Sequence, residues 1–265
     1  MMTEIEKKVY EKLRGVVDED DAAVDARELC RAFSGDALSE AVERRISGEP
    51  LQYIIGEWDF YNCTFRVGEG VLIPRPETEL LVDEALKFLS NVPQAKVLDL
   101  CAGSGCIGIS IAKNTPACKV FSVEKTPAAY EYLKQNAILN GVKGKVFTYC
   151  DDILDGCDFI VSSKGGFDLI VSNPPYVKSA ECDTLQREVM REPREALDGG
   201  EDGLLFYRAI AERWLPLLRK GGLLLVECGE DQAEDVVSIF KAASDGETYT
   251  LTDFAGIQRA VAIKT

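Results

Sequence analysis

The sequence predicts an α/β fold with a doubly wound, mainly parallel sheet of seven strands, preceded by a small N-terminal helical domain and a β-hairpin linker. Two observations support this prediction. From residue 96 onward, short apolar segments alternate with amphipathic segments of helical period, which is typical of strands joined by helices on both faces of a sheet. Over residues 3–47, in contrast, apolar residues recur at helical spacing alone.

The helical domain is expected over residues 1–50. Ile5, Val9 and Leu13 recur at the spacing of one helix face, and similar spacing returns up to Ile46. These stretches mix polar and apolar residues, which indicates a small appendage rather than a part of the sheet.

The linker is expected over residues 51–77. Within it, residues 57–73 alternate, with aromatic and β-branched side chains around Asn62, and predict a β-hairpin. A helix should then begin at Thr78, whose hydroxyl is expected to cap the segment ELLVDEALKFL. The remaining domain is placed at 78–265.

Strands and helices alternate through this last domain. The seven strands are expected at 97–100, 120–124, 146–150, 167–172, 223–228, 248–253 and 260–263. The helices are expected near 106–113, 127–140, 204–218 and 231–243. In such a sheet, ligands bind at the carboxyl ends of the strands, where the strand order reverses.

The composition excludes several kinds of chemistry. The 265 residues include no histidine, so no His-dependent triad and no His-ligated metal site can form. The nine cysteines contain no CxxC pair, which indicates reduced thiols and no metal site. The net charge of −15 lowers the expectation of a nucleic-acid partner. With no apolar run of about 20 residues and a charged N-terminus, we expect a cytoplasmic protein without a membrane partner.

The first predicted strand runs into a glycine-rich loop. Gly103, Gly105 and Gly108 satisfy the GxGxxG spacing between a strand and a helix, where a side chain would block a cofactor from the backbone. The second strand ends at Glu124, 21 residues after Gly103, where a carboxylate can accept hydrogen bonds from both ribose hydroxyls.

Two cofactors fit this arrangement, a dinucleotide and S-adenosylmethionine. A dinucleotide would place its pyrophosphate on the helix N-terminus. S-adenosylmethionine carries a sulfonium cation and no phosphate, so it is favoured by the nearby acids Asp99, Glu124 and Asp151-Asp152 and by the lack of Lys or Arg in the loop.

The fourth strand ends in Asn173-Pro174-Pro175-Tyr176. A planar NH2 group is a poor nucleophile because its lone pair is delocalised. The Asn173 side-chain oxygen and the Pro174 carbonyl can accept its two N–H bonds and orient it, while Tyr176 stacks on the planar group and excludes water. The motif indicates methylation of an amino or amide nitrogen; adenine, guanine and glutamine are all possible acceptors.

Further segments carry a more specific pattern. They are GEPLQYIIG (48–56), LIPRPETE (72–79), EPREALDGGEDG (192–203), GGLLLVECGEDQ (221–232) and DFAGIQR (253–259). With the Asn-Pro-Pro-Tyr motif, they resemble the peptide chain release factor N5-glutamine methyltransferases, the PrmC/HemK family. The resemblance covers residues 48–265.

The resemblance implies a class I methyltransferase with a Rossmann-like fold. It would transfer a methyl group from S-adenosylmethionine to the glutamine of the Gly-Gly-Gln motif in class 1 release factors, modulating translation termination and leaving S-adenosylhomocysteine. It implies a cytoplasmic, monomeric enzyme that binds no metal and no nucleic acid directly. The N-terminal helical domain would recognise the release factor.

The resemblance also implies the site residues. The catalytic, amide-binding residues would be Asn173, Pro174, Pro175 and Tyr176, with Arg75 as a further substrate contact. The cofactor would be bound by Asp99, Cys101, Ala102, Gly103, Ser104, Gly105, Glu124, Asp152, Ile153 and Asn173. For Arg75 and Glu79 a purely structural role at the entry to a helix is an equal alternative, as it is for the acidic loop 192–203, which would otherwise act as a lid.

Three departures from the family pattern stand out. Cys101-Ala102 replaces a glycine-led loop, Glu124 stands where Asp is common, and the N-terminal part is short. Three other functions remain open: a nucleic-acid amino-methyltransferase acting on adenine or guanine, an NAD-dependent oxidoreductase, and a non-catalytic binding module.

Overall fold

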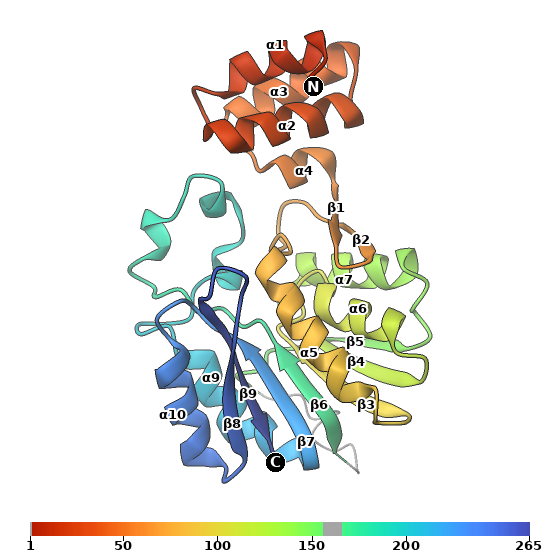
Figure 1. The fold of residues 1–265 in the computed structure, drawn as a ribbon, viewed down its shortest axis with the longest axis vertical. Helices are drawn as coiled ribbons and strands as arrows, with labels where there is room; N and C mark the ends of the chain where they lie inside the picture. Colours follow the sequence, from red (N-terminus) through yellow and green to blue (C-terminus); the bar gives the residue numbers. More distant parts are fainter. Residues whose placement is uncertain (1, 156–165) are drawn as a thin grey trace.

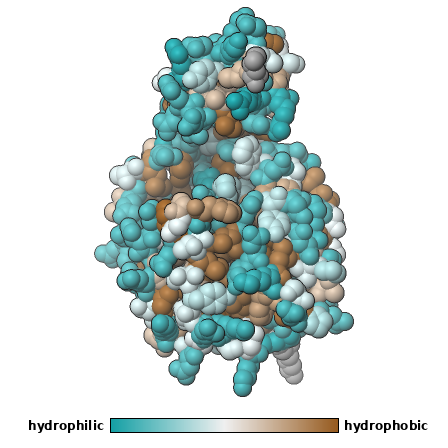
Figure 2. Space-filling model, viewed as in Figure 1, coloured by the Kyte–Doolittle hydropathy of each residue, from teal (hydrophilic) through white to brown (hydrophobic). Residues whose placement is uncertain are grey.

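The computed structural model describes residues 2–155 and 166–265, which form a helical bundle and a larger α/β body joined by a hairpin (Figure 1). In Figure 2 the bundle presents a mostly hydrophilic face, whereas apolar residues gather on the α/β body below it. Within the described ranges, no helix is both long enough and apolar enough to cross a membrane.

The bundle contains α1 (Glu4–Leu13), α2 (Glu19–Ala32), α3 (Gly35–Ile46) and the short α4 (Leu51–Ile55). Helix α1 begins with a capping box, in which Thr3 and Glu6 accept each other's backbone N–H. Leu51 and Ile54 of α4 pack into the apolar cluster of the three longer helices. The first turn of the range predicted as linker therefore packs against the bundle.

The linker hairpin pairs β1 (Glu57–Phe60) with the antiparallel β2 (Cys63–Arg66). Its turn contains Asn62, as the sequence predicts, and Tyr61 there has φ +57°. Strand pairing ends at Arg66, so the hairpin is shorter than the predicted 57–73. Gly68 and Gly70 lie in the irregular segment that follows.

The predicted seven-stranded sheet is confirmed, in the order β5-β4-β3-β6-β7-β9-β8. All pairs are parallel except those of β9 with β7 and β8. The strands are β3 (Ala95–Leu100), β4 (Cys118–Glu124), β5 (Val146–Cys150), β6 (Phe167–Ser172), β7 (Leu218–Glu227), β8 (Glu247–Thr252) and β9 (Gln258–Lys264). The chain moves outward from β3 to β5 and then crosses back to β6, so the strand order reverses between β3 and β6.

Each face of the sheet has its own apolar core. One face packs against α5 (Glu79–Leu89), α6 (Cys106–Asn114) and α7 (Pro127–Leu139), through residues such as Leu81, Ile109 and Leu133. The other packs against α9 (Leu205–Ala209) and α10 (Ala233–Ala243), through Tyr207 and Phe240. This two-sided cover is the doubly wound arrangement that the sequence predicts (Figure 1).

The segment predicted as one helix over 204–218 is irregular. Helix α9 continues as a π turn (Ile210–Trp214) and then a 3-10 turn (Leu215–Leu217). Pro216 cannot donate a backbone hydrogen bond, which ends regular winding. Trp214 is fully buried and donates from Nε1 to the carbonyl of Ile153 at 3.0 Å, so this turn also supports the chain after β5.

A second difference concerns Thr78, which was expected to cap a helix. Its backbone is helical, it ends a 3-10 turn (Pro76–Thr78), and its side chain makes no capping bond. The hydroxyl instead points into the α/β body, where Glu227 and Asn173 are its partners. The capping prediction was wrong because a tertiary partner, a buried carboxylate, competes for the same hydroxyl.

Candidate active site

The loop of residues 101–105 joins β3 to α6 at the carboxyl edge of the sheet. Cys101, Gly103 and Gly105 adopt left-handed backbone angles, with φ of +56°, +55° and +83°. A Cβ at Gly105 would lie 2.5 Å from Leu133 Cδ1, so a side chain there would displace Leu133 and also strain the left-handed backbone. Cys101 holds the same conformation with a side chain, which strains the backbone at the position where the family pattern has glycine.

Glu124 lies directly behind this loop at the end of β4. Its Oε2 accepts the backbone N–H of Gly103 at 2.8 Å, and its Oε1 accepts that of Thr126 at 2.7 Å. Burial raises the pKa of Glu124, and the two backbone donors act in the opposite direction. The carboxylate therefore fixes the loop and keeps lone pairs for a ligand's hydroxyl groups.

A cavity of about 320 Å³ opens between the glycine loop and the chain that leads into α9. Six of the predicted cofactor residues line it: Cys101, Gly103, Glu124, Asp152, Ile153 and Asn173. Ala102 and Ser104 line a smaller space of about 30 Å³ beside it. Gly105 is the N-cap of α6. Sequence reasoning thus located one wall of this cavity.

Asp99 lies outside this wall. It is fully buried beneath the loop, where Ser122 Oγ donates to its Oδ2 at 3.1 Å. A Cβ on Gly108 would come within 2.5 Å of the same oxygen. Burial raises the pKa of Asp99 to about 7. In this structure Asp99 supports the loop from below and has no surface with which to contact a cofactor.

The cavity is acidic. Its lining includes one lysine and five carboxylates, which belong to Glu124, Asp151, Asp152, Glu195 and Asp198. The lysine, Lys125, is already paired with Asp152 Oδ2 at 2.8 Å, while Asp152 Oδ1 accepts the N–H of Leu154 at 2.9 Å. This surplus of negative charge favours a cationic ligand and disfavours a pyrophosphate.

A second cavity, of about 250 Å³, lies on the other side of Asn173. Its lining includes Arg75, Pro174 and Tyr176. The remaining lining side chains are mainly apolar: Leu72, Val177, Leu185, Val189, Ala196 and Leu197. Asn173 lines both cavities, so a group in one can meet a group in the other beside its side chain.

The Asn-Pro-Pro-Tyr segment follows β6 directly. Pro175 lines the first cavity, whereas Pro174 and Tyr176 line the second. Asn173 Nδ2 donates to Thr78 Oγ1 at 3.2 Å. Tyr176 donates from its hydroxyl to Glu227 Oε1 at 3.4 Å, and burial raises its pKa, so the phenol stays neutral.

Arg75 forms an ion pair with Glu192, the first residue of the 192–203 loop. The sequence had left the roles of both Arg75 and this loop open. Glu192 is 5% exposed, pairs with Arg75 and accepts the backbone N–H of Ile73 at 2.9 Å. Glu79, by contrast, accepts the backbone N–H of Tyr61 at 2.7 Å and holds the hairpin. Arg75 thus lies at the second cavity, whereas Glu79 has the structural role.

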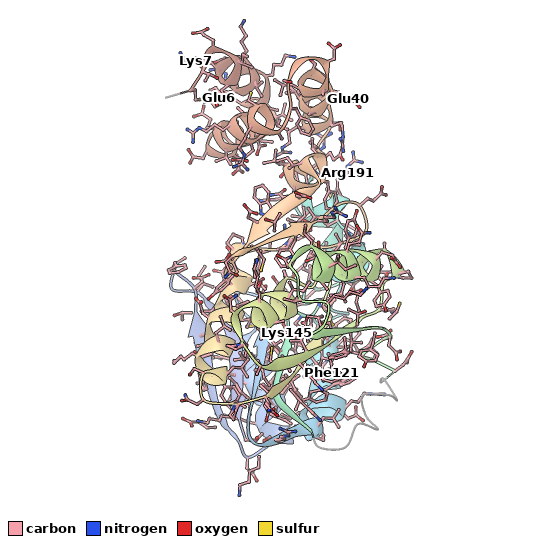
Figure 3. All side chains as sticks on the ribbon, turned by 90° about the vertical axis from the view of Figure 1, so that its right-hand side faces the viewer. Glu6, Lys7, Glu40, Phe121, Lys145 and Arg191 are labelled. Atoms are coloured by element: carbon pink, nitrogen blue, oxygen red, sulfur yellow. The ribbon has the colours of Figure 1, made fainter. Side chains whose placement is uncertain are left out.

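The segment that supplies Leu185 and Val189 to the second cavity also contacts the helical bundle. Glu188, next to its lining residues, pairs with Arg45 at 2.6 Å, and Arg45 is buried against Asp25. Arg187 and Arg191 donate to the carbonyl of Ser47 at 2.5 and 3.3 Å. Figure 3 shows Arg191 at the junction between the bundle and the α/β body.

Comparison with known proteins agrees with this geometry. Residues 77–213 match the family model of the methyltransferase small domain. The chain is 43% identical over 231 residues to the release factor glutamine methyltransferase of Thermodesulfovibrio yellowstonii, covering 86% of this chain and 80% of that one. It is also 43% identical over 221 residues to that of Geobacter sulfurreducens, covering 83% and 75%.

The chain belongs to the release factor glutamine methyltransferase family. The ribosomal protein L11 methylase of Lactobacillus delbrueckii subsp. bulgaricus has the same fold, with a TM-score of 0.51 and 18% identity over 76% of this chain and 84% of that one. As a methyltransferase of this family, the chain uses S-adenosylmethionine. The open backbone at Gly103, the carboxylate of Glu124 and the acidic lining fit a cationic sulfonium cofactor that contains a ribose.

Some residues that line the cavities or lie behind Asn173 were not identified from the sequence of this glutamine methyltransferase. Thr78 was taken for a cap, and Leu72, Leu205 and Phe206 carried no chemical signal. Glu227 did carry a sequence signal, because it ends an apolar strand at the carboxyl edge of the sheet, as Glu124 does. Across residues 2–155 and 166–265, no group of three or more Cys, Asp or Glu side chains is arranged to hold a metal ion.

Proposed function

We propose that this chain methylates the side-chain amide nitrogen, N5, of the glutamine in the Gly-Gly-Gln motif of class 1 peptide chain release factors and so modulates translation termination. Family membership supports the activity. The observation that carries the proposal is the position of Asn173, which lines both the acidic cavity and the mainly apolar one. The first would hold the methyl donor and the second the glutamine.

The acceptor amide needs orientation more than it needs a base. Its lone pair is delocalised into the carbonyl, so a site must hold the NH2 group in line with the methyl group. Asn173 Oδ1 and the Pro174 carbonyl would accept its two N–H bonds, and neither Pro174 nor Pro175 has an N–H that competes. Tyr176 would cover the planar amide, and Arg75 would contact the chain on either side of it.

The donor side would be held mainly by carboxylates and backbone. S-adenosylmethionine supplies an electrophilic methyl group on a sulfonium. Glu124 would accept the ribose hydroxyls, the loop from Cys101 to Gly105 would contact the methionine portion, and Asp152 with Ile153 would contact the adenine. After transfer, S-adenosylhomocysteine leaves. The enzyme's contribution is alignment, which can supply a large part of the rate enhancement.

We further propose that the helical bundle recognises the release factor and that the chain acts as a monomer in the cytoplasm. The Ser47 carbonyl, at the end of α3 in the bundle, accepts hydrogen bonds from Arg187 and Arg191, which flank the cavity-lining Val189. A release factor bound to the bundle would therefore lie next to the cavity that receives its glutamine. The net charge of −15 disfavours the nucleic-acid alternative.

Mass spectrometry of a release factor incubated with the enzyme and S-adenosylmethionine tests the function. The expected result is the added mass of one CH2 group on the Gly-Gly-Gln peptide. A release factor with alanine in place of that glutamine should gain no mass. Methylation elsewhere on the release factor, or salt-sensitive methylation of RNA or DNA instead, would contradict the proposal.

A further inference from the structure

A buried chain of hydrogen bonds runs behind Asn173. Asn173 Nδ2 lies 3.2 Å from Thr78 Oγ1, which in turn lies 2.6 Å from Glu227 Oε2. Thr78 is 1% exposed and Glu227 3%. The three residues come from the end of β6, the turn before α5 and the end of β7, so only the folded sheet brings them together.

The charge of Glu227 sets the direction of these bonds. An ionised carboxylate can only accept, so the Thr78 hydroxyl must donate its proton to Glu227. The Thr78 oxygen then accepts a bond from Asn173, which must turn its NH2 toward Thr78. The Asn173 side chain lines both cavities, and its oxygen accepts no hydrogen bond from a described residue, so it is available to a ligand there.

We propose that Glu227 and Thr78 are positioning residues, which hold the Asn173 carboxamide with its oxygen toward the acceptor. This inference rests on the proposed function, because an amide acceptor needs an oxygen at that point. The two ends of a carboxamide are nearly identical in shape. An Asn173 turned the other way would present an NH2 to the substrate's NH2, and neither group could accept.

The surroundings of Glu227 make this direction sensitive to pH. Burial raises the pKa of Glu227 to about 7, and Glu77 adds to the effect. The hydrogen bonds from Thr78 and Tyr176 and the charge of Arg259 oppose it. The other titratable groups facing Glu227 are Cys106, Cys228 and Tyr207, whose hydroxyl donates to the Glu227 carbonyl.

Protonation of Glu227 permits the reverse direction. The carboxylic acid can donate to Thr78, whose hydroxyl is then free to donate to Asn173 Oδ1. That arrangement holds the Asn173 oxygen away from the acceptor. Turnover should therefore fall as the pH drops through the pKa of Glu227, whereas cofactor binding should depend on it much less.

Substitutions of Thr78 test directly the chain of hydrogen bonds from Glu227 to Asn173. Thr78→Val keeps the shape and removes the hydroxyl, so kcat should fall about tenfold to a hundredfold with cofactor affinity within about twofold. Thr78→Ser keeps the hydroxyl and should restore most of the rate. The matched control is Thr115→Val, since Thr115 is buried but its hydroxyl bonds to no nitrogen or oxygen atom of the described residues. A Thr78→Val enzyme with the wild-type kcat, or a Thr78→Ser enzyme as slow as Thr78→Val, would overturn the proposal.

Glu227→Gln tests the direction. The glutamine side chain can donate or accept, so it no longer fixes the orientation of Asn173; kcat should fall about tenfold and lose its acidic limb near pH 7. An unchanged acidic limb in this variant would contradict the proposed role.

A third measurement separates this proposal from the proposed function. The side-chain amide resonances of Asn173 can be followed by 15N NMR in the enzyme with cofactor and no acceptor. They should shift with pH in the wild type and stay constant in Glu227→Gln. Constant resonances in the wild type would overturn the positioning role, whereas failure of the wild type to methylate a release factor would count against the function alone.

Discussion

The two cavities that meet at Asn173, the first proposed for the methyl donor and the second for the acceptor glutamine, are built in different ways. The donor cavity uses chain directly after β3, β4 and β5, so most of its polar groups lie at strand ends that the sheet itself aligns. The acceptor cavity combines Leu72 and Arg75 with the segment after β6 and with residues 185–197.

The interactions that hold the lining residues in place also differ between the two cavities. Behind the donor cavity are hydrogen bonds from backbone N–H groups to carboxylates of neighbouring segments, such as the one from Gly103 to Glu124. Around the acceptor cavity are side-chain pairs between distant segments, Arg75 with Glu192 and Arg45 with Glu188. Substitutions on the donor side should therefore change cofactor affinity, and those on the acceptor side should change the use of the protein substrate.

The largest effect should come from Asn173→Ala, at the point shared by the cavities. The variant loses the acceptor for one amide N–H, a hydrogen bond worth about 1.5–3 kcal/mol, so kcat should fall roughly tenfold to a hundredfold. Cofactor affinity should change less. Steady-state kinetics with a release factor and calorimetry with S-adenosylmethionine measure both. Asn62→Ala, in the exposed hairpin turn, is the control, and full turnover by Asn173→Ala would refute the assigned role.

Glu124→Ala should act on the donor side alone. Removal of this carboxylate takes away the ribose acceptor and leaves the N–H groups of Gly103 and Thr126 without their partner. The dissociation constant for S-adenosylmethionine should rise about tenfold, measured by calorimetry. At saturating cofactor, kcat should recover most of its value. An unchanged affinity would count against the assignment.

Arg75→Met should act on the acceptor side alone. It leaves the buried Glu192 without its cation and loosens residues 185–197, so KM for the release factor should rise about fivefold. Calorimetry should find the cofactor affinity unchanged. The control is Arg208→Met, which breaks an exposed pair with Asp202. A variant that loses cofactor affinity but keeps its KM would reverse the distinction drawn between the cavities.

The smallest effect on methylation should come from Asp99, whose substitution should change stability instead. Its pKa in the folded state is about 7, against an ordinary value of 3.8, so between these pH values the folded protein keeps a proton that the unfolded chain has lost. The contribution of Asp99 to stability therefore falls as the pH rises from about 4 to 7. Asp99→Asn should flatten the dependence of Tm on pH over this window, measured by calorimetry. Exposed Asp36→Asn should keep the wild-type slope, and an equal slope in Asp99→Asn would contradict the prediction.

Sequence reasoning reached the sheet, the strand ends and the residues that follow them. Glu124 and Asn173 could be predicted to line one cavity because Glu124 ends an apolar strand and Asn173 directly follows one. The carboxyl ends of parallel strands meet at one edge of the sheet. The sequence predicted Asp99 among the cofactor contacts, but its side chain is fully buried beneath the loop. The alternation of residues within a strand does not reveal how deeply its last residues are buried. The sequence predicted one regular helix over 204–218, but the structure has a short helix followed by a π turn and a 3-10 turn. Pro216 ends the regular helix because it has no backbone N–H to donate.

The sequence by itself determined the class of fold, the glycine loop and the Asn-Pro-Pro-Tyr motif proposed to bind the amide, because these depend on residues that are neighbours in the chain or on adjacent strands. Only the tertiary structure decided the partners of Thr78, Glu227 and Arg75. A hydroxyl, a carboxylate and a guanidinium each have several possible local partners, and which one they find depends on distant segments that burial brings within hydrogen-bonding distance.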